Sequence, residues 1–110
     1  GMLGFLFTED DALELDEKSV SKLKENAPEV LDATIHFIEN YDGPFTTEAL
    51  EHALRELIVE GMDIKPRIAF GPIRVAVTGR QVSPPLFESM EILGRESVLN
   101  RLHSLRNRLG

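Results

Sequence analysis

The residues from Arg74 to Met90, RVAVTGRQVSPPLFESM, bring together side chains that could grip a polyanion or an unpaired base. Arginine offers a planar fork of donors to a phosphate or a base edge, and aromatic or apolar faces offer a surface for stacking. A helix that begins near Ser83 and Pro84 would add free backbone N–H groups to such a site. Recognition of a few flipped-out nucleotides is one chemistry that this stretch would serve.

The same residues also allow an ordinary structural interpretation. Leu86 and Phe87 would belong to the core, Pro84 would open a helix, and Arg74 would form a surface salt bridge. On residue types alone, this interpretation is favoured over base recognition.

Charge is distributed unevenly along a chain whose formal net charge is -7. Residues 1–64 carry four Lys and Arg against sixteen Asp and Glu, whereas residues 65–110 carry eight against three. Such asymmetry is a hint of a polyanionic partner. Basic residues near helix carboxyl ends would equally complement helix dipoles, so both explanations stay open.

Catalytic patterns are absent from the sequence. There is no cysteine, so neither a disulfide nor a thiolate site can form. His36, His52 and His103 lack the spacing of metal ligands and are expected to lie on helix surfaces. No nucleophile elbow, dinucleotide fingerprint or phosphate-binding loop occurs. We therefore expect this chain to catalyse nothing alone and to hold no metal or cofactor of its own.

Length and composition indicate one modest globular domain. The chain has 110 residues, 42% of them hydrophobic and 28% charged. It contains neither an apolar run long enough to cross a membrane nor a signal-peptide pattern, so the cytosol is the expected compartment.

Helical periodicity covers most of the chain. Residues 2–16 are interpreted as a connector and residues 17–110 as a helical domain. Short apolar stripes and breakers predict five helices outside residues 65–79. They are a short helix at Glu17–Lys24, one capped by a box of Asn26 and Glu29 and ending near Tyr41, one from Thr46 to about Gly61, and a pair that starts at Pro84 and is divided at Gly94.

Residues 65–79 are ambiguous by pattern. Ile73, Val75 and Val77 alternate as in a strand, and Pro72 disfavours a regular helix. No second convincing strand is available to pair with this one, which favours an all-helical domain. A helix here would begin near Pro66, bend at Pro72 and end at Gly79.

A longer sequence motif indicates a protein family. The segment KPRIAFGPIRVAVTGRQVSPPLFESMEILGRESVLNRL, residues 65–102, closely resembles the carboxyl-terminal end of bacterial glutamyl-tRNA synthetases. The shared pattern is a helix with L/I-R-x-A-x-T-G, a short loop, S/T-P-P/G-L-F-E, and then L-G-R/K-E. The apolar "FLF" near the start and the acidic link after it also match. The likeness covers nearly the whole chain and is weakest over residues 8–45.

This resemblance implies both a fold and a function. The fold is all-α, a bundle of five to six helices of the type that binds the anticodon in class I aminoacyl-tRNA synthetases, with residues 66–79 helical. The family attaches glutamate to tRNA(Glu) using ATP and magnesium in a separate catalytic domain. Because the HIGH-like and KMSKS-like signatures of that domain are missing here, the fragment is expected to recognise tRNA(Glu) without chemistry. We expect a monomer that binds neither DNA nor a membrane.

The family motif also assigns candidate residues to anticodon binding. Arg74 matches the family arginine that approaches the anticodon, and Ser83 stands where threonine is common. Pro85 replaces a glycine and removes one N–H donor, which disfavours a backbone contact there. The full candidate set is Arg74, Arg80, Gln81, Ser83, Pro84, Leu86 and Phe87.

Two other functions compete with this one. A helical protein-interaction module could use the apolar MLGFLF segment and the Leu-Phe surface to dock a partner helix. A small enzyme is the third and weakest alternative. Under the tRNA-binding hypothesis, Arg74, Arg80 and residues 83–87 should form one basic face, opposite the acidic residues of segment 9–32.

Overall fold

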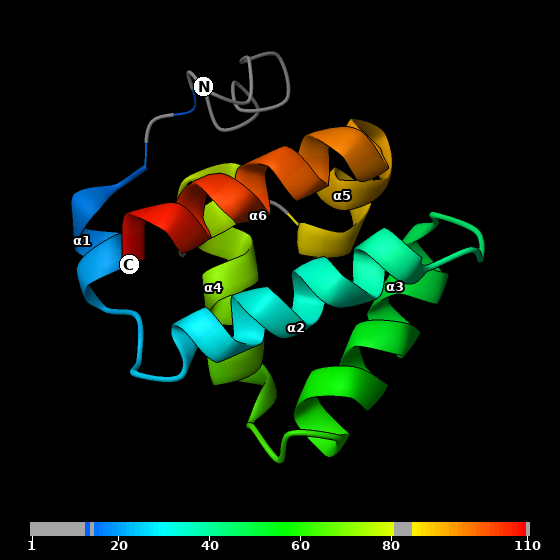
Figure 1. Ribbon diagram of the computed structural model, residues 1–110, viewed down its shortest axis with the longest axis horizontal. Coiled ribbons are helices and arrows are strands. Elements are labelled where there is room, and N and C mark those ends of the chain that lie inside the picture. Colours follow the sequence, from blue (N-terminus) through cyan, green and yellow to red (C-terminus); the bar gives the residue numbers. More distant parts are fainter. Residues whose placement is uncertain (1–12, 14, 81–84, 110) are drawn as a thin grey trace.

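The computed structural model describes residues 13, 15–80 and 85–109, and every regular element within these ranges is helical (Figure 1). Helix α3 continues directly into the wider π-helical turns of η3. The all-α fold of five to six helices is therefore confirmed for the described residues. In chain order the elements are α1 (Glu17–Ser21), α2 (Ala27–Asn40), α3 (Thr47–Leu54), η3 (Arg55–Glu60), α4 (Pro66–Thr78), α5 (Leu86–Leu93) and α6 (Arg95–Leu109).

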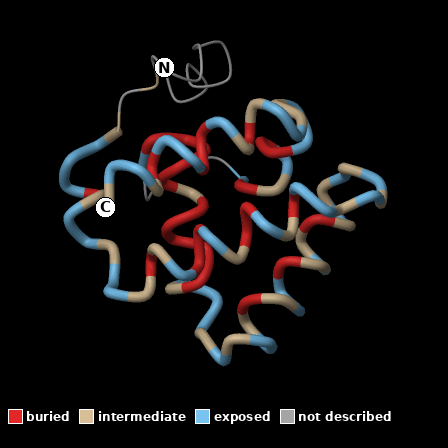
Figure 2. The backbone as a smooth tube through the Cα atoms, in the orientation of Figure 1, coloured by how far each residue is buried: buried red, intermediate tan, exposed pale blue. Residues whose placement is uncertain are grey.

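Helix α4 lies at the centre of the domain, in contact with α2, η3, α5 and α6. Nearly all of its residues from Ala69 onward are buried, which Figure 2 shows as an almost continuous red helix. Burial of almost every side chain from Ala69 to Thr78 explains why this segment is apolar apart from Arg74 and Thr78. The helix predicted for this segment is confirmed, and the strand interpretation of residues 73–77 is wrong.

Local chemistry sets both ends of α4. Pro66 occupies a first helical position, where its missing N–H has no intrahelical acceptor to serve. Gly79 ends the helix in the left-handed region, at φ 85°, where a side chain would be strained. Pro72 lies inside the helix and leaves the carbonyl of Ile68 without its usual donor. A bend at Pro72 stays a prediction.

Helices α2 and α6 cover α4 with amphipathic faces and also pack against each other. Their buried residues recur every three or four positions, as expected for helices with one face on a core. In α2 these are Ala27, Val30, Leu31, Thr34, Ile35 and Ile38, and in α6 they are Val98, Arg101, Leu102 and Leu105.

Helix α3 begins at the predicted cap. The Thr46 hydroxyl accepts a hydrogen bond from the N–H of Ala49 at 3.4 Å. The Glu91 carboxylate on α5 accepts from the backbone N–H and the hydroxyl of Thr47, the latter at 2.9 Å. A carboxylate at this end complements the helix dipole and joins α3 to α5.

The predicted capping box at Asn26 and Glu29 is wrong. Asn26 has turn-like dihedral angles, φ -83° and ψ 2°, and its side chain makes no capping hydrogen bond. A cap needs an extended backbone for its side chain to reach the third helical N–H. The buried Oδ1 of Asn26 has no hydrogen-bond partner among the described residues.

Two other helix boundaries differ from the prediction. Helix α1 ends at Ser21 rather than Lys24, because Leu23 N–H bonds three residues back to the carbonyl of Val20 and tightens the chain into a turn. Helix α5 begins at Leu86, after an extended Pro85 with ψ 124°, rather than at Pro84. A proline disfavours helical geometry in the residue before it, which argued from the sequence against a start at Pro84.

Candidate functional site

The end of α4 and the start of α5 flank residues 81–84, and both carry predicted site residues. We call the described residues of this region, Arg74, Thr78–Arg80 and Pro85–Phe87, the α4–α5 corner. The two helices pack against each other directly (Figure 1).

Hydrogen bonds hold the α4 side of the corner. The Thr78 hydroxyl donates to the carbonyl of Arg74 at 2.7 Å and accepts from the N–H of Arg80 at 3.3 Å. The backbone N–H of Asp16 donates to the carbonyl of Gly79 at 2.8 Å. The chain is therefore fixed up to Arg80, immediately before residues 81–84.

Arg101 supports the same end of α4 from the core. Only 1% of this arginine is exposed, and its Nη1 donates to the carbonyl of Val77 at 2.8 Å. A positive charge at the carboxyl end of a helix is favourable, and the carbonyls of the last turn need partners from outside the helix. Arg101 thus satisfies a buried acceptor at the base of the corner.

The α5 side of the corner is also held by its own residues. The buried Ser89 hydroxyl donates to the carbonyl of Pro85 at 2.8 Å. The Phe87 ring packs edge-on against Phe70 of α4, with ring centroids 5.2 Å apart, and the Arg55 guanidinium lies 5.5 Å from the Phe70 centroid. These aromatic and cation–π contacts tie α5 to α4 and η3.

The predicted site residues fall into three groups. Arg74 and Phe87 are half-buried and Arg80 is exposed, and all three lie in the corner. Leu86 is only 2% exposed and belongs to the hydrophobic core, so it supports the corner rather than offering an open face. Gln81, Ser83 and Pro84 lie outside the described residues.

Arg74 differs from the other corner arginine in its surroundings. Burial lowers the pKa of its guanidinium below the ordinary value, whereas Arg80 is exposed. Partial desolvation strengthens the hydrogen bonds that a charged fork makes to a ligand. Of the two arginines, Arg74 is therefore better placed for a specific contact.

Comparison with known proteins identifies the family. The family model described as "Anticodon binding domain" matches residues 1–106 of the chain. This chain belongs to the anticodon binding domain family.

Individual relatives of this anticodon binding domain are glutamate–tRNA ligases. The ligase of Kocuria rhizophila is 57% identical over 109 residues, 99% of this chain and 21% of its own length. Those of Kineococcus radiotolerans and Mycolicibacterium smegmatis are each 56% identical, over 96% and 94% of this chain and 21% of their own lengths. The chain therefore spans about a fifth of the curated relatives that it matches.

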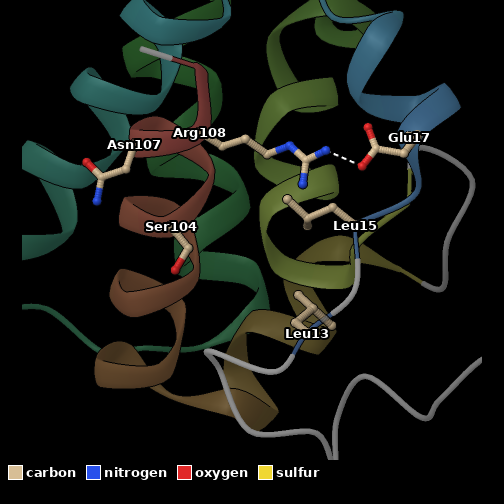
Figure 3. Close-up of a pocket in the computed structure, with 6 residues that line it drawn as sticks. All are labelled: Leu13, Leu15, Glu17, Ser104, Asn107 and Arg108. Atoms are coloured by element: carbon tan, nitrogen blue, oxygen red, sulfur yellow. Dashed lines mark hydrogen bonds and ion pairs between the residues drawn. The ribbon is translucent and has the colours of Figure 1, made fainter.

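The predicted opposition of a basic corner to the acidic residues of segment 9–32 fails at Asp16 of this anticodon binding domain, whose N–H bonds to Gly79 and whose carboxylate is influenced by Arg80. Arg106 of α6 pairs with Asp32 of α2 at 2.8 Å, and Arg108 pairs with Glu17 (Figure 3). An open hollow of about 700 Å³, lined partly by Leu13 and Leu15, lies beside the second pair. The basic half of the sequence folds onto the acidic half, so charge segregation along the chain becomes ion pairing in space.

The carboxyl group of Asp16 lies near a basic residue of the corner, Arg80, and its pKa can be tested. Its side chain caps α1 by accepting from the N–H and hydroxyl of Ser19, at 3.2 and 2.7 Å. The hydroxyl contact is the largest cause of a lowered pKa at Asp16, and the positive charges of Arg80 and Lys18 add to it. We expect Ser19→Ala to raise the pKa of Asp16 toward its ordinary value, measured by NMR titration of the carboxyl group.

The sign of the pH effect follows from the lowered pKa. The Asp16 cap should stabilise the fold above the unfolded pKa of about 4, and this contribution should disappear as the pH falls through the folded value. The free energy of unfolding of Asp16→Asn should therefore differ from that of the unsubstituted chain at neutral pH, and the two values should converge in acid. An unchanged Asp16 pKa in Ser19→Ala would contradict this assignment.

The histidines and carboxylates of the described residues form no metal site. His52 and His103 are exposed helix residues 3.6 and 3.8 Å from carboxylates, and His36 is exposed as well, as predicted. Across residues 13, 15–80 and 85–109, no three His, Asp or Glu are grouped to hold a metal ion. In these same ranges no helix is long and apolar enough to cross a membrane.

Arg101 is the supporting residue that sequence reasoning missed. Its spacing offered a signal, because it follows Val98 by three positions and precedes Leu105 by four, on the apolar face of α6. A charged residue inside such a stripe is rarely left unpaired. Its acceptor on α4, 24 residues earlier, could not be read from that spacing.

Proposed function

We propose that this chain is the anticodon-binding part of a glutamate–tRNA ligase and that it recognises the anticodon of tRNA(Glu) at the α4–α5 corner. The observation that carries the proposal is the 57% identity, across 99% of the chain, to the glutamate–tRNA ligase of Kocuria rhizophila. Glutamate activation, with ATP and magnesium, would belong to the rest of the ligase. We propose a monomer that acts in the cytoplasm, where tRNA is charged.

The chemistry of the corner supports this function. Arg74 provides a half-buried fork for a base edge, and Arg80 provides an exposed charge for the RNA backbone. Phe87 offers part of an aromatic ring next to the start of α5, and unpaired bases are commonly bound by stacking on such rings. The hydrogen bonds at Thr78, Gly79 and Pro85 hold these groups in place before RNA arrives, which reduces the entropic cost of binding.

Arg74→Ala in the full-length ligase tests the proposal. Loss of a fork on an anticodon base should cost about 1–3 kcal/mol, by analogy with bidentate base contacts in DNA, or roughly a tenfold to hundredfold fall in kcat/KM for tRNA(Glu). The KM values for ATP and glutamate should stay unchanged, because those substrates bind elsewhere. The measurement is steady-state charging of tRNA(Glu) and of a tRNA(Glu) with a substituted anticodon.

The two tRNAs separate the roles that Arg74 could have. Base reading predicts that Arg74→Ala slows charging of the natural tRNA more than charging of the substituted one. Equal slowing of both would make Arg74 a backbone contact, and no slowing of either would make it structural. Arg95→Ala, at an exposed arginine that starts α6, is the matched control and should leave kcat/KM within about twofold.

A further inference from the structure

A second basic feature lies at the opposite end of α4 from the corner. A hollow of about 110 Å³ opens between the segment after α1 and the first turns of α4. Exposed cationic side chains form its rim, and partly or fully buried apolar residues form its floor. The rim residues are Lys22, Lys24 and Arg67, and the floor residues are Leu23, Ile68, Gly71 and Pro72.

The three rim cations form no ion pair with the described residues. No acidic residue lines the hollow. Lys22, Lys24 and Arg67 make no side-chain ion pair or hydrogen bond with the residues that the structure describes, whereas Arg55, Arg106 and Arg108 each pair with a carboxylate. Like charges gathered at one site repel each other, and a bound anion removes that repulsion. The chain as a whole is acidic, with a net charge of -7, so its overall composition does not account for a cluster of unpaired cations.

The size and chemistry of the hollow fit a single phosphate group. Its volume is well below the about 300–1,000 Å³ of pockets that enclose drug-sized ligands. Arginine binds phosphate oxygens with a two-pronged fork, and lysine adds a point charge from any side. The amino end of α4, at Pro66, contributes a partial positive charge of its own.

The position of the hollow relates it to the α4–α5 corner. Arg67 and Arg74 are seven residues apart on α4, so they lie on one face of the helix, about 10 Å apart along its axis. Gly71 lies between them on that face and adds no side chain of its own. One RNA segment could therefore contact both arginines.

We propose that Lys22, Lys24 and Arg67 form a phosphate subsite that holds the RNA backbone next to the nucleotides read at Arg74. This inference rests on the proposed function, because the RNA that occupies the subsite is the one bound at the corner. Backbone contacts of this kind fix the register of an RNA without reading its sequence. The subsite therefore contributes affinity and position, and the corner contributes selectivity.

Binding of an RNA hairpin with the anticodon stem and loop of tRNA(Glu) tests the subsite. In NMR titrations of the 110-residue chain, the amides of Ile68, Gly71 and Arg74 should shift together as RNA is added. Lys24→Gln and Arg67→Gln should each weaken binding about fivefold at low salt and lower the slope of log affinity against log salt by about 0.7. Lys65→Gln removes one charge from the same segment outside the hollow, and it should change the affinity less than twofold.

The possible outcomes separate the subsite from the proposed function. Shifts confined to Arg74 and the start of α5, with none at Ile68 and Gly71, would overturn the subsite and leave anticodon binding standing. The absence of RNA-dependent shifts anywhere would overturn both. Equal effects of Lys24→Gln and Lys65→Gln on the affinity would mean that the cluster acts only as general surface charge, which would overturn the subsite. Inorganic phosphate is the ligand control, and saturation of the hollow by phosphate as tightly as by RNA would make it a free-anion site instead.

Discussion

Replacing Arg101 by alanine is expected to destabilise the domain by about 3–5 kcal/mol, one of the two largest effects that we predict for any single substitution. The change removes a charge-assisted hydrogen bond, leaves the buried carbonyl of Val77 without its donor, and opens a cavity where the long side chain packed. Urea unfolding, followed by circular dichroism, measures the free energy of unfolding directly.

Two further variants isolate the cause of that loss. Arg101→Met keeps most of the aliphatic volume but not the donor, so it should cost less than Arg101→Ala. Arg108→Ala removes an arginine of the same helix from a surface pair with Glu17 and should cost at most about 1 kcal/mol. If Arg101→Ala cost no more than Arg108→Ala, Arg101 would not be an anchor of α4.

Phe87→Ala is expected to lower both stability and RNA affinity. The half-buried ring packs edge-on against Phe70 and against the core, so its loss should cost about 3 kcal/mol of folding free energy. The substitution should also remove the exposed part of the ring on which a base could stack, and such stacking is worth about 1–3 kcal/mol per base. Unfolding experiments and RNA titrations on the same variant measure the two effects separately.

The two roles of Phe87 separate in Phe87→Leu. Leucine fills much of the same volume, so the stability should largely recover. Leucine offers no flat ring for a base to stack on, so the RNA affinity should stay low. Recovery of both stability and affinity would show that Phe87 acts only through packing. A double-mutant cycle with Phe70→Leu should give a coupling of about 0.5–1.5 kcal/mol for the ring pair.

Boundary errors in the sequence prediction have identifiable physical causes. The cap at Thr46 was predictable because a hydroxyl before an apolar stripe needs only local geometry. Asn26 carried the same kind of signal and failed, because its backbone adopts a turn that holds the side chain away from the helix N–H groups. The sequence could have excluded Pro84 as the start of α5, because Pro85 disfavours helical geometry in the residue before it, whereas the extended backbone of Pro85 is seen only in the structure.

The sequence by itself determined the helical class, the stripes of α2 and α6, the glycine that ends α4, and the family motif that marks Arg74 and Phe87. These features depend on side-chain periodicity and local backbone preference, which are set by residues close together in the sequence. Only the tertiary structure decided that α4 is the buried centre, that Arg101 reaches Val77, and that Arg106 and Arg108 neutralise Asp32 and Glu17. It also brought Lys22 and Lys24 beside Arg67, more than forty residues away along the chain. Such contacts depend on how helices pack against one another, and the pattern within a single helix does not specify its partner.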